Sequence, residues 1–197
     1  TGNLQTEKNQ LVRLTTPDKF IAWDEDNDVP DYPGAHGCAG WTKEDARVLI
    51  YDRYDIWSFD PEGKKAPVRL TKNGRENKVT YRRIVLDREQ MDIDLKEPML
   101  MTGFNEVDKS TAVYRARLIA PATPTLLAGG NFNYDNVMKA KNADKYIYSK
   151  ENFEVFPDVW VADANFKKNL QLTQGIRQQD AFIWGTAELI SWISLDG

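Results

Sequence analysis

Short apolar runs alternate with polar turn sequences along most of the chain, and the runs have the length of β-strands. Val48–Tyr51 is apolar throughout, which is typical of a strand covered on both faces. Asp55–Phe59 alternates polar and apolar positions, which indicates a strand with one covered face. The sequence Asp-Pro-Glu-Gly at 60–63 has the preferences of a type I turn and leads toward Val68–Thr71. Residues 41–71 therefore predict an antiparallel meander.

Four more segments have strand-like patterns, and a polar stretch at 105–110 predicts a hairpin between the first two. The segments are Met99–Phe104, Ala112–Leu118, Lys145–Tyr148 and Leu189–Ile193. No amphipathic helix longer than two turns is expected, and Lys139–Lys145 is ambiguous because Ala and Lys favour helix weakly. The pattern as a whole predicts an all-β fold class.

A four-residue sequence, Val-Arg-Leu-Thr, occurs at Val12–Thr15 and again at Val68–Thr71. Weaker copies follow at Ala116–Ile119 and Leu170–Thr173. Marks at intervals of about fifty residues indicate an array of similar structural units. We interpret each mark as the last strand of a unit, so that the units end near residues 15, 71, 119 and 173.

A longer match between two of these units supports the repeat. Asp55–Trp57 matches Asp158–Trp160, and in both copies a second Asp follows three residues after the Trp. Many short strands on a repeating frame are typical of β-propeller blades, in which Trp57 and Trp160 would fill the gaps between neighbours. We therefore predict a partial β-propeller over residues 1–197, with about three antiparallel four-stranded blades and an exit strand over 174–197.

Composition and charge argue against several function classes. With 28% charged and 41% hydrophobic residues, the chain resembles an ordinary soluble domain with a sizeable core. The net charge of −4 argues against binding to nucleic acid or anionic lipid. No apolar run approaches the ~20 residues of a membrane span. One cysteine, Cys38, excludes an intramolecular disulfide. We expect both ends to continue in a longer protein.

An acidic loop at 24–31 is the first candidate site. The stretch 24–28, Asp-Glu-Asp-Asn-Asp, places oxygen ligands at positions 1, 3 and 5 of a calcium loop. Such a loop requires Gly and Glu at two later positions, where this chain has Val29 and Ala35. A solvated acidic loop is the preferred interpretation, and a calcium site is the alternative.

Three other stretches contain residue types that are used in chemistry. His36 and Cys38 are too few for a zinc site, which needs about four ligands, so we expect an ordinary loop. Ala128–Asn131 lacks the Lys and Ser or Thr of a phosphate-binding loop and is interpreted as a connecting loop. Arg82 and Arg83, with Arg75 and Lys78 nearby, have acidic neighbours in sequence, which favours surface ion pairs over nucleic-acid contacts. No catalytic, cofactor-binding or metal-binding residue is assigned.

Four stretches share one resemblance. They are Gly40–Thr42, YDRYDIWSFDPEG at 51–63, FPDVWVADANF at 156–166 and WGTAELISWISLDG at 184–197. They resemble the propeller of serine peptidases of the prolyl oligopeptidase family, especially bacterial prolyl oligopeptidases, dipeptidyl peptidases and acylaminoacyl peptidases. The similarity covers most of residues 20–197.

The resemblance implies a propeller above an α/β-hydrolase domain, with Trp192–Gly197 as the stretch that leaves the propeller. The hydrolase domain would begin just beyond Gly197. The Gly-x-Ser-x-Gly elbow of the family's nucleophile does not occur in this sequence, and His36 lies far upstream of that domain. The adjacent glutamates by which dipeptidyl peptidases hold the substrate amino terminus do not occur either.

The expected function is that of a non-catalytic propeller segment of such a serine peptidase, which limits access and orients short peptides. Its expected partners are the peptide substrate and the hydrolase domain of the parent protein. A stand-alone propeller for protein or glycan binding is the alternative, and an extracytoplasmic sensor segment is a third. The parent is expected in the periplasm or outside the cell, with the cytoplasm as the alternative. Open sheet faces would also favour self-association, or marginal stability of the chain by itself.

Overall fold

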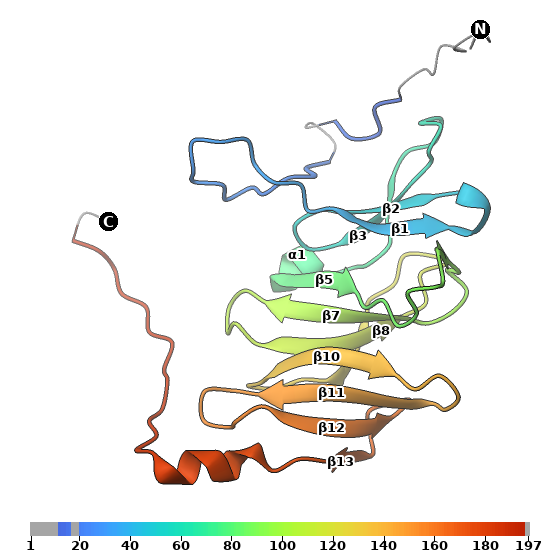
Figure 1. Cartoon of the computed structure of the whole chain (residues 1–197). Coiled ribbons are helices and arrows are strands. Elements are labelled where there is room, and N and C mark those ends of the chain that lie inside the picture. The colour runs from blue at the N-terminus through green and yellow to red at the C-terminus, as the bar shows by residue number, and fades with distance from the viewer. Residues whose placement is uncertain (1–11, 17–19, 196–197) are drawn as a thin grey trace, which may run out of the picture.

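The computed structural model describes residues 12–16 and 20–195, which form mainly antiparallel β-strands in three sheets (Figure 1). The first sheet contains β1 (Cys38–Thr42), β2 (Val48–Tyr51), β3 (Ile56–Phe59), β4 (Val68–Arg69) and β6 (Asp92–Ile93). The second contains β5 (Val79–Arg83), β7 (Met99–Asn105), β8 (Thr111–Ala116) and β9 (Thr125–Ala128). The third contains β10 (Asn133–Lys139), β11 (Lys145–Glu151), β12 (Asp158–Asp163) and β13 (Asn169–Gln171). The predicted all-β class is confirmed.

Helical structure in the described part is limited to short segments. They are α1 (Gly74–Asn77) and the 3₁₀ helices η1 (Lys43–Asp45) and η2 (Gly175–Ala181). This agrees with the expectation that no long amphipathic helix is present.

Each sheet contains a meander in which the chain moves from one edge strand to the opposite edge. The orders are β4-β3-β2-β1-β6, β5-β7-β8-β9 and β10-β11-β12-β13. The exception is β6, which lies between β5 and β7 in sequence but pairs in parallel with β1 of the first sheet. In this pairing Trp41 lies opposite Asp92, and Thr42 lies opposite Ile93.

Two apolar clusters join the sheets in sequence order. The first cluster lies between the first and second sheets and includes the fully buried Leu49, Met101 and Leu118. The second lies between the second and third sheets and includes Val113 and Tyr148. Because burying a side chain of this size stabilises a fold by about 1.5–3 kcal/mol, these two interfaces provide much of the stability.

A buried carboxylate–threonine contact closes the first sheet. Asp55, which has no exposed area, accepts a hydrogen bond of 2.8 Å from the Thr71 hydroxyl. The same hydroxyl oxygen accepts the Ile56 N–H at 2.9 Å. Asp55 also lies 2.8 Å from a guanidinium nitrogen of Arg69, which balances its charge. We call this arrangement the Asp–Thr clasp.

The third sheet has a second Asp–Thr clasp in the same geometry. The Thr173 hydroxyl donates to the buried carboxylate of Asp158, and its oxygen accepts the Val159 N–H at 2.9 Å. The Gly175 N–H donates to the same carboxylate at 2.7 Å. Each clasp therefore joins the start of the third strand of a meander to the residues just after its fourth strand. This explains why Asp and Thr recur together in the sequence.

Gly74 lies beside the first clasp, where there is no room for a larger residue. A Cβ atom at this position would lie 2.5 Å from Asp55 Oδ1. Glycine therefore allows the backbone after Thr71 to approach the buried carboxylate closely. The Arg75 N–H, one residue further on, uses this approach to donate to Asp55 Oδ2 at 3.3 Å.

Most of the predicted strands and turns are confirmed. The segments expected as strands within 48–71, 99–118 and 145–148 contain β2, β3, β4, β7, β8 and β11. The turn at 60–63 closes through a hydrogen bond of 2.9 Å from the Gly63 N–H to the Asp60 carbonyl. The hairpin at 105–110 closes through the Asn105 N–H and the Ser110 carbonyl, also at 2.9 Å.

Two of the four repeat marks were misinterpreted. Ala116 ends β8, and the fourth strand of the second sheet is β9, so this unit does not end near 119. Leu118 instead fills the core between the first two sheets. Residues 12–15 form no strand, because no described segment pairs with them. The mark at 71 and the mark at 173 both follow a fourth strand directly.

The exit strand expected over 174–197 is not observed in the described part of this segment. Residues 175–181 form η2, and residues 182–195 have no strand pairing. The expected strand Leu189–Ile193 is exposed because it meets no sheet edge. The last two positions, 196 and 197, lie outside the described residues.

The two repeated tryptophans occupy matching positions. Trp57 pairs with Arg69 and Trp160 pairs with Gln171, in each case two residues before the clasp threonine. Trp160 packs into the cluster between the second and third sheets, as predicted. Trp57 packs against Phe20 of the N-terminal segment, with ring centroids 5.5 Å apart, rather than against another sheet.

Candidate binding surface at the loop end

The turns after the second strands and the connections between sheets lie at one end of the molecule, on the left in Figure 1. They comprise residues 52–55, 70–78, 106–110, 129–132 and 152–157. We call this end the loop end. Successive strands of a meander run in opposite directions. The turn after the second strand and the connection after the fourth strand therefore lie at the same end of each sheet.

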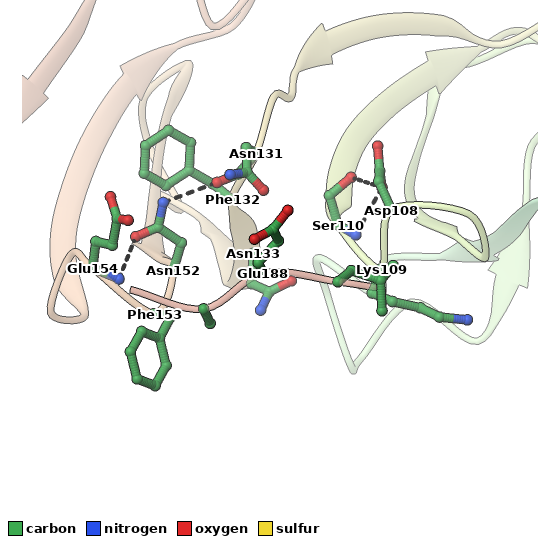
Figure 2. Close-up of a pocket in the computed structure, with 12 residues that line it drawn as sticks. Asp108, Lys109, Ser110, Asn131, Phe132, Asn133, Asn152, Phe153, Glu154 and Glu188 are labelled. Atoms are coloured by element: carbon green, nitrogen blue, oxygen red, sulfur yellow. Dashed lines mark hydrogen bonds between the residues drawn. The ribbon is translucent and has the colours of Figure 1, made fainter. Parts of the chain in front are cut away.

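The loop end contains a cavity of about 390 Å³ between the second and third sheets, shown in Figure 2. We call it the loop-end cavity. Three loops and part of the C-terminal segment line it, and their lining residues are Asp108–Ser110, Asn131–Asn133, Asn152–Glu154 and Ala187–Leu189. A cavity of this size accommodates a small ligand or a few residues of a peptide.

The asparagines of the cavity divide into one that shapes a loop and two that are available to a ligand. The Asn152 amide donates to the Asn131 carbonyl at 3.0 Å and accepts the N–H groups of Glu154 and Val155 at 3.0 and 2.7 Å. The side chains of Asn131 and Asn133 have no hydrogen-bond partner among the described residues. Phe132 and Phe153 supply apolar surface beside them.

The charge of the cavity is mainly acidic. Asp108, Glu154 and Glu188 line it, whereas its one basic residue, Lys109, directs its ammonium group away from the centre in Figure 2. The hydroxyl and N–H of Ser110 donate to the Asp108 carboxylate and lower its pKa, so Asp108 is ionised at neutral pH. The lining therefore favours a ligand with hydrogen-bond donors or positive charge.

The loop-end cavity has no serine–histidine pair among its lining residues. Its only hydroxyl, Ser110 Oγ, donates to Asp108 Oδ1 at 2.6 Å and has no imidazole beside it. Activation of serine requires a general base in contact, most often histidine. The sole histidine of the chain, His36, lines a different cavity. The lining residues can bind and orient a ligand through their amide, aromatic and carboxylate groups.

A second, more open cavity of about 440 Å³ lies where the acidic loop meets the turns of the first two sheets. At its edge, Arg53 contacts Asp26 at 2.6 Å and Glu106 at 2.8 Å. The Tyr54 hydroxyl donates to Glu106 at 2.7 Å. Burial, together with this bond to Glu106, raises the pKa of Tyr54 to about 12. Burial opposes ionisation of Glu106, but the donors Arg53 and Tyr54 outweigh it and lower its pKa.

The acidic loop binds arginine side chains of the fold. Glu25 contacts Arg75 at 2.9 Å and Asp26 contacts Arg53, while Asp24 accepts the Asp26 N–H at 3.1 Å. Among residues 12–16 and 20–195, no group of three or more His, Cys, Asp or Glu side chains is arranged to hold a metal ion. The loop therefore docks onto α1 and the β2–β3 turn through ion pairs.

His36 and Cys38 lie near the start of β1 and form no common site. Burial, and then the charge of Arg82, lower the pKa of His36. Cys38 is a free, exposed thiol. Ala128–Asn131 connects the second sheet to the third, as the connecting-loop interpretation expected, and the Gly129 carbonyl accepts the Tyr134 hydroxyl at 3.2 Å.

The expected surface ion pair forms at Arg75, which contacts Glu25 at 2.9 Å, whereas Arg82 and Arg83 donate to backbone carbonyls instead. Arg82 donates to the carbonyls of Tyr81, Asp52 and Arg53 at 2.9, 3.3 and 3.2 Å. Arg83 donates to the Ala39 carbonyl at 3.0 Å. Apart from the Tyr81 carbonyl, these acceptors belong to β1 and the β2–β3 turn of the first sheet, which β5 lies beside. The two side chains therefore join sheets, and sequence neighbours could not reveal partners about thirty residues or more away.

No helix of the described residues is long and apolar enough to cross a membrane. No protein-family model matches the chain, and no curated protein matches it at a significant level.

Proposed function

We propose that this chain forms β-propeller blades of a serine peptidase of the prolyl oligopeptidase family. The observation that carries the proposal is the succession of three antiparallel meanders packed in sequence order, two of which close with the same Asp–Thr clasp. Repeated sheets that cover one another's faces are typical of propeller blades. The sequence resemblance at 51–63 and 156–166 coincides with the clasped strands.

In this proposal the blades limit access to a neighbouring catalytic domain and orient short peptides. Orientation of a bound substrate lowers the entropic part of a reaction barrier. The loop-end cavity supports this role, because Asn131 and Asn133 offer amide groups that can pair with a peptide backbone. The nucleophile, base and acid would come from the hydrolase domain of the parent protein.

The experiment begins with the coding sequence beyond Gly197. The proposal expects a Gly-x-Ser-x-Gly elbow, followed by Asp and His. The full-length protein should then cleave short peptides but not folded proteins, and removal of the blades should relax this size limit. A stop codon or an unrelated domain after Gly197 would contradict the proposal.

A stand-alone propeller that binds protein or glycan is the second candidate. The aromatic and amide side chains of the loop-end cavity, Phe132, Phe153, Asn131 and Asn133, favour it, because sugars are bound by such combinations of apolar surface and directed polar groups. Titration of the chain with neutral oligosaccharides, followed by nuclear magnetic resonance of the asparagine side-chain amides, would separate this candidate from the first.

A further inference from the structure

The segment Phe182–Leu195 has a composition that is unusual for an exposed part of a protein. It has one charged residue, Glu188, and no proline. Its large apolar side chains are exposed, and the most exposed are Ile183, Trp192, Ile193 and Leu195. In Figure 1 it runs from η2 along the loop end of the sheets, without pairing to any strand.

One residue attaches this segment to the sheets. The Trp184 indole N–H donates to the Phe153 carbonyl at 2.7 Å, and the two rings lie 6.0 Å apart. In the described structure this is the only side-chain hydrogen bond between residues 182–195 and the rest of the chain. Directly after it, Gly185 has nothing within 4 Å of the position of a Cβ atom, so the chain is loosely packed there.

The attachment places the following residues over the loop-end cavity. Ala187, Glu188 and Leu189 form one wall, opposite loops of the second and third sheets (Figure 2). Removal of this wall would disturb no sheet, because none of the three residues belongs to a strand or to an apolar cluster. Segments with so few contacts open at low cost in free energy.

We propose that Trp184 is a latch that holds residues 185–189 as a strap over the loop-end cavity, and that the strap opens while the sheets stay folded. The latch is small, since it consists of one neutral hydrogen bond and one aromatic contact. In the closed position the strap forms one wall of the cavity near Asn133, Asp108 and Glu154, whose side chains are exposed, and opening removes this wall and widens access to them. A role of the strap in controlling peptide access rests on the proposed function, whereas the opening of the strap at Trp184 does not depend on it.

Distance measurements between two spin labels test the latch on the chain as it stands. The labels are attached through Lys109→Cys and Glu188→Cys, on opposite walls of the cavity, in a Cys38→Ser background. The parent should give a narrow distance distribution with a minor broad component. Trp184→Ala should raise the broad, open component about tenfold, because both contacts are lost. Trp184→Phe, which keeps a ring but loses the N–H donor, should raise it less.

Trp192→Ala is the matched control, because Trp192 lies in the same segment and is exposed. It should leave the distribution unchanged, and circular dichroism should show the same strand content in all variants. A broad distribution in the parent would overturn the strap, and a narrow one in Trp184→Ala would overturn the latch. Neither result depends on peptidase activity, so failure of the proposed function would be seen separately, in the sequence beyond Gly197.

Discussion

At the scale of single residues, the two Asp–Thr clasps make the same bonds in different surroundings. Thr71 is completely buried, whereas Thr173 is exposed. Both carboxylates are buried, but water can occupy the place of a lost hydroxyl at the exposed Thr173 and cannot do so at the buried Thr71. The same substitution should therefore have a larger effect in the first sheet than in the third.

We expect Thr71→Val to lower the free energy of unfolding by about 3 kcal/mol, because it leaves a buried carboxylate and the Ile56 N–H without this partner. Thr173→Val should lower it by about 1 kcal/mol. Urea denaturation of both variants measures the difference. Equal losses would mean that burial does not determine the strength of the clasp.

Asp158 gives a prediction for pH. Hydrogen bonds from the Gly175 N–H, the Thr173 hydroxyl and the Gln171 amide lower the pKa of Asp158. A group with a lowered pKa stabilises the folded state fully above its unfolded pKa of about 4 and loses this contribution as the pH falls further. Asp158→Asn should therefore be less stable than the parent at pH 7, and the difference should shrink below about pH 4.

Urea denaturation at several pH values checks this prediction for Asp158. Asp28→Asn, at an exposed position of the acidic loop, is the matched control and should follow the parent at every pH. A stability difference between Asp158→Asn and the parent that stays constant down to pH 2 would contradict the assigned role of the carboxylate.

At the scale of elements, a clear apolar pattern made several strands predictable, whereas β10 lacks such a pattern. Val48–Tyr51 was recognisable as a strand because all four residues are apolar, and Met99–Phe104 because most of its residues are apolar. β10, with the sequence NYDNVMK, was missed because only Tyr134 and Val137 are buried. Its remaining positions are exposed, so tertiary packing against β8 and β11 decides its conformation.

The opposite error occurred at Leu189–Ile193. Its pattern is that of a strand, but a strand needs hydrogen-bond partners along its edge, and the described residues supply none here. The candidate surface was missed for a related reason. Asp108, Asn131 and Glu188 come from three segments far apart in the sequence, which are brought together by the packing of the second and third sheets and by the contact of Trp184 with Phe153, and no spacing in the sequence reveals that proximity.

The β2–β3 and β7–β8 turns give a prediction at this scale, because Glu106 connects them. It accepts Arg53 Nε at 2.8 Å and the Tyr54 hydroxyl at 2.7 Å. Glu106→Gln should lower the free energy of unfolding by about 1–2 kcal/mol, and Tyr54→Phe by about 1 kcal/mol. In a double-mutant cycle the two effects should be coupled by about 0.5–1.5 kcal/mol, whereas additive effects would argue against a shared hydrogen bond.

At the scale of the whole molecule, the third sheet has one uncovered apolar face. Met138 pairs with Ile147, Ile147 with Val161, and Val161 with Leu170, so these side chains lie on the same face. The opposite face packs on the second sheet through Trp160. Leu170 is 63% exposed and Met138 is 55% exposed, so large apolar side chains are exposed at both edge strands of this face.

We expect this face to cause concentration-dependent self-association of the isolated chain. Leu170→Lys should weaken the association at least tenfold, because it places a charge on the most exposed large side chain of this apolar face. Val85→Lys introduces the same charge at an exposed position outside the third sheet and should have little effect. Sedimentation velocity over a range of concentrations measures both. A tightly folded monomer at all concentrations would contradict the expectation.

The pairing of β6 with β1 has a mechanical consequence. Since the loop between β5 and β7 supplies a strand to the preceding sheet, the first two sheets are interlaced and cannot be separated without breaking that pairing. No such exchange joins the third sheet to the second in the described part of the chain. If the chain is pulled from its ends, the third sheet should unravel first, as a separate step, and the interlaced pair should yield together at higher force.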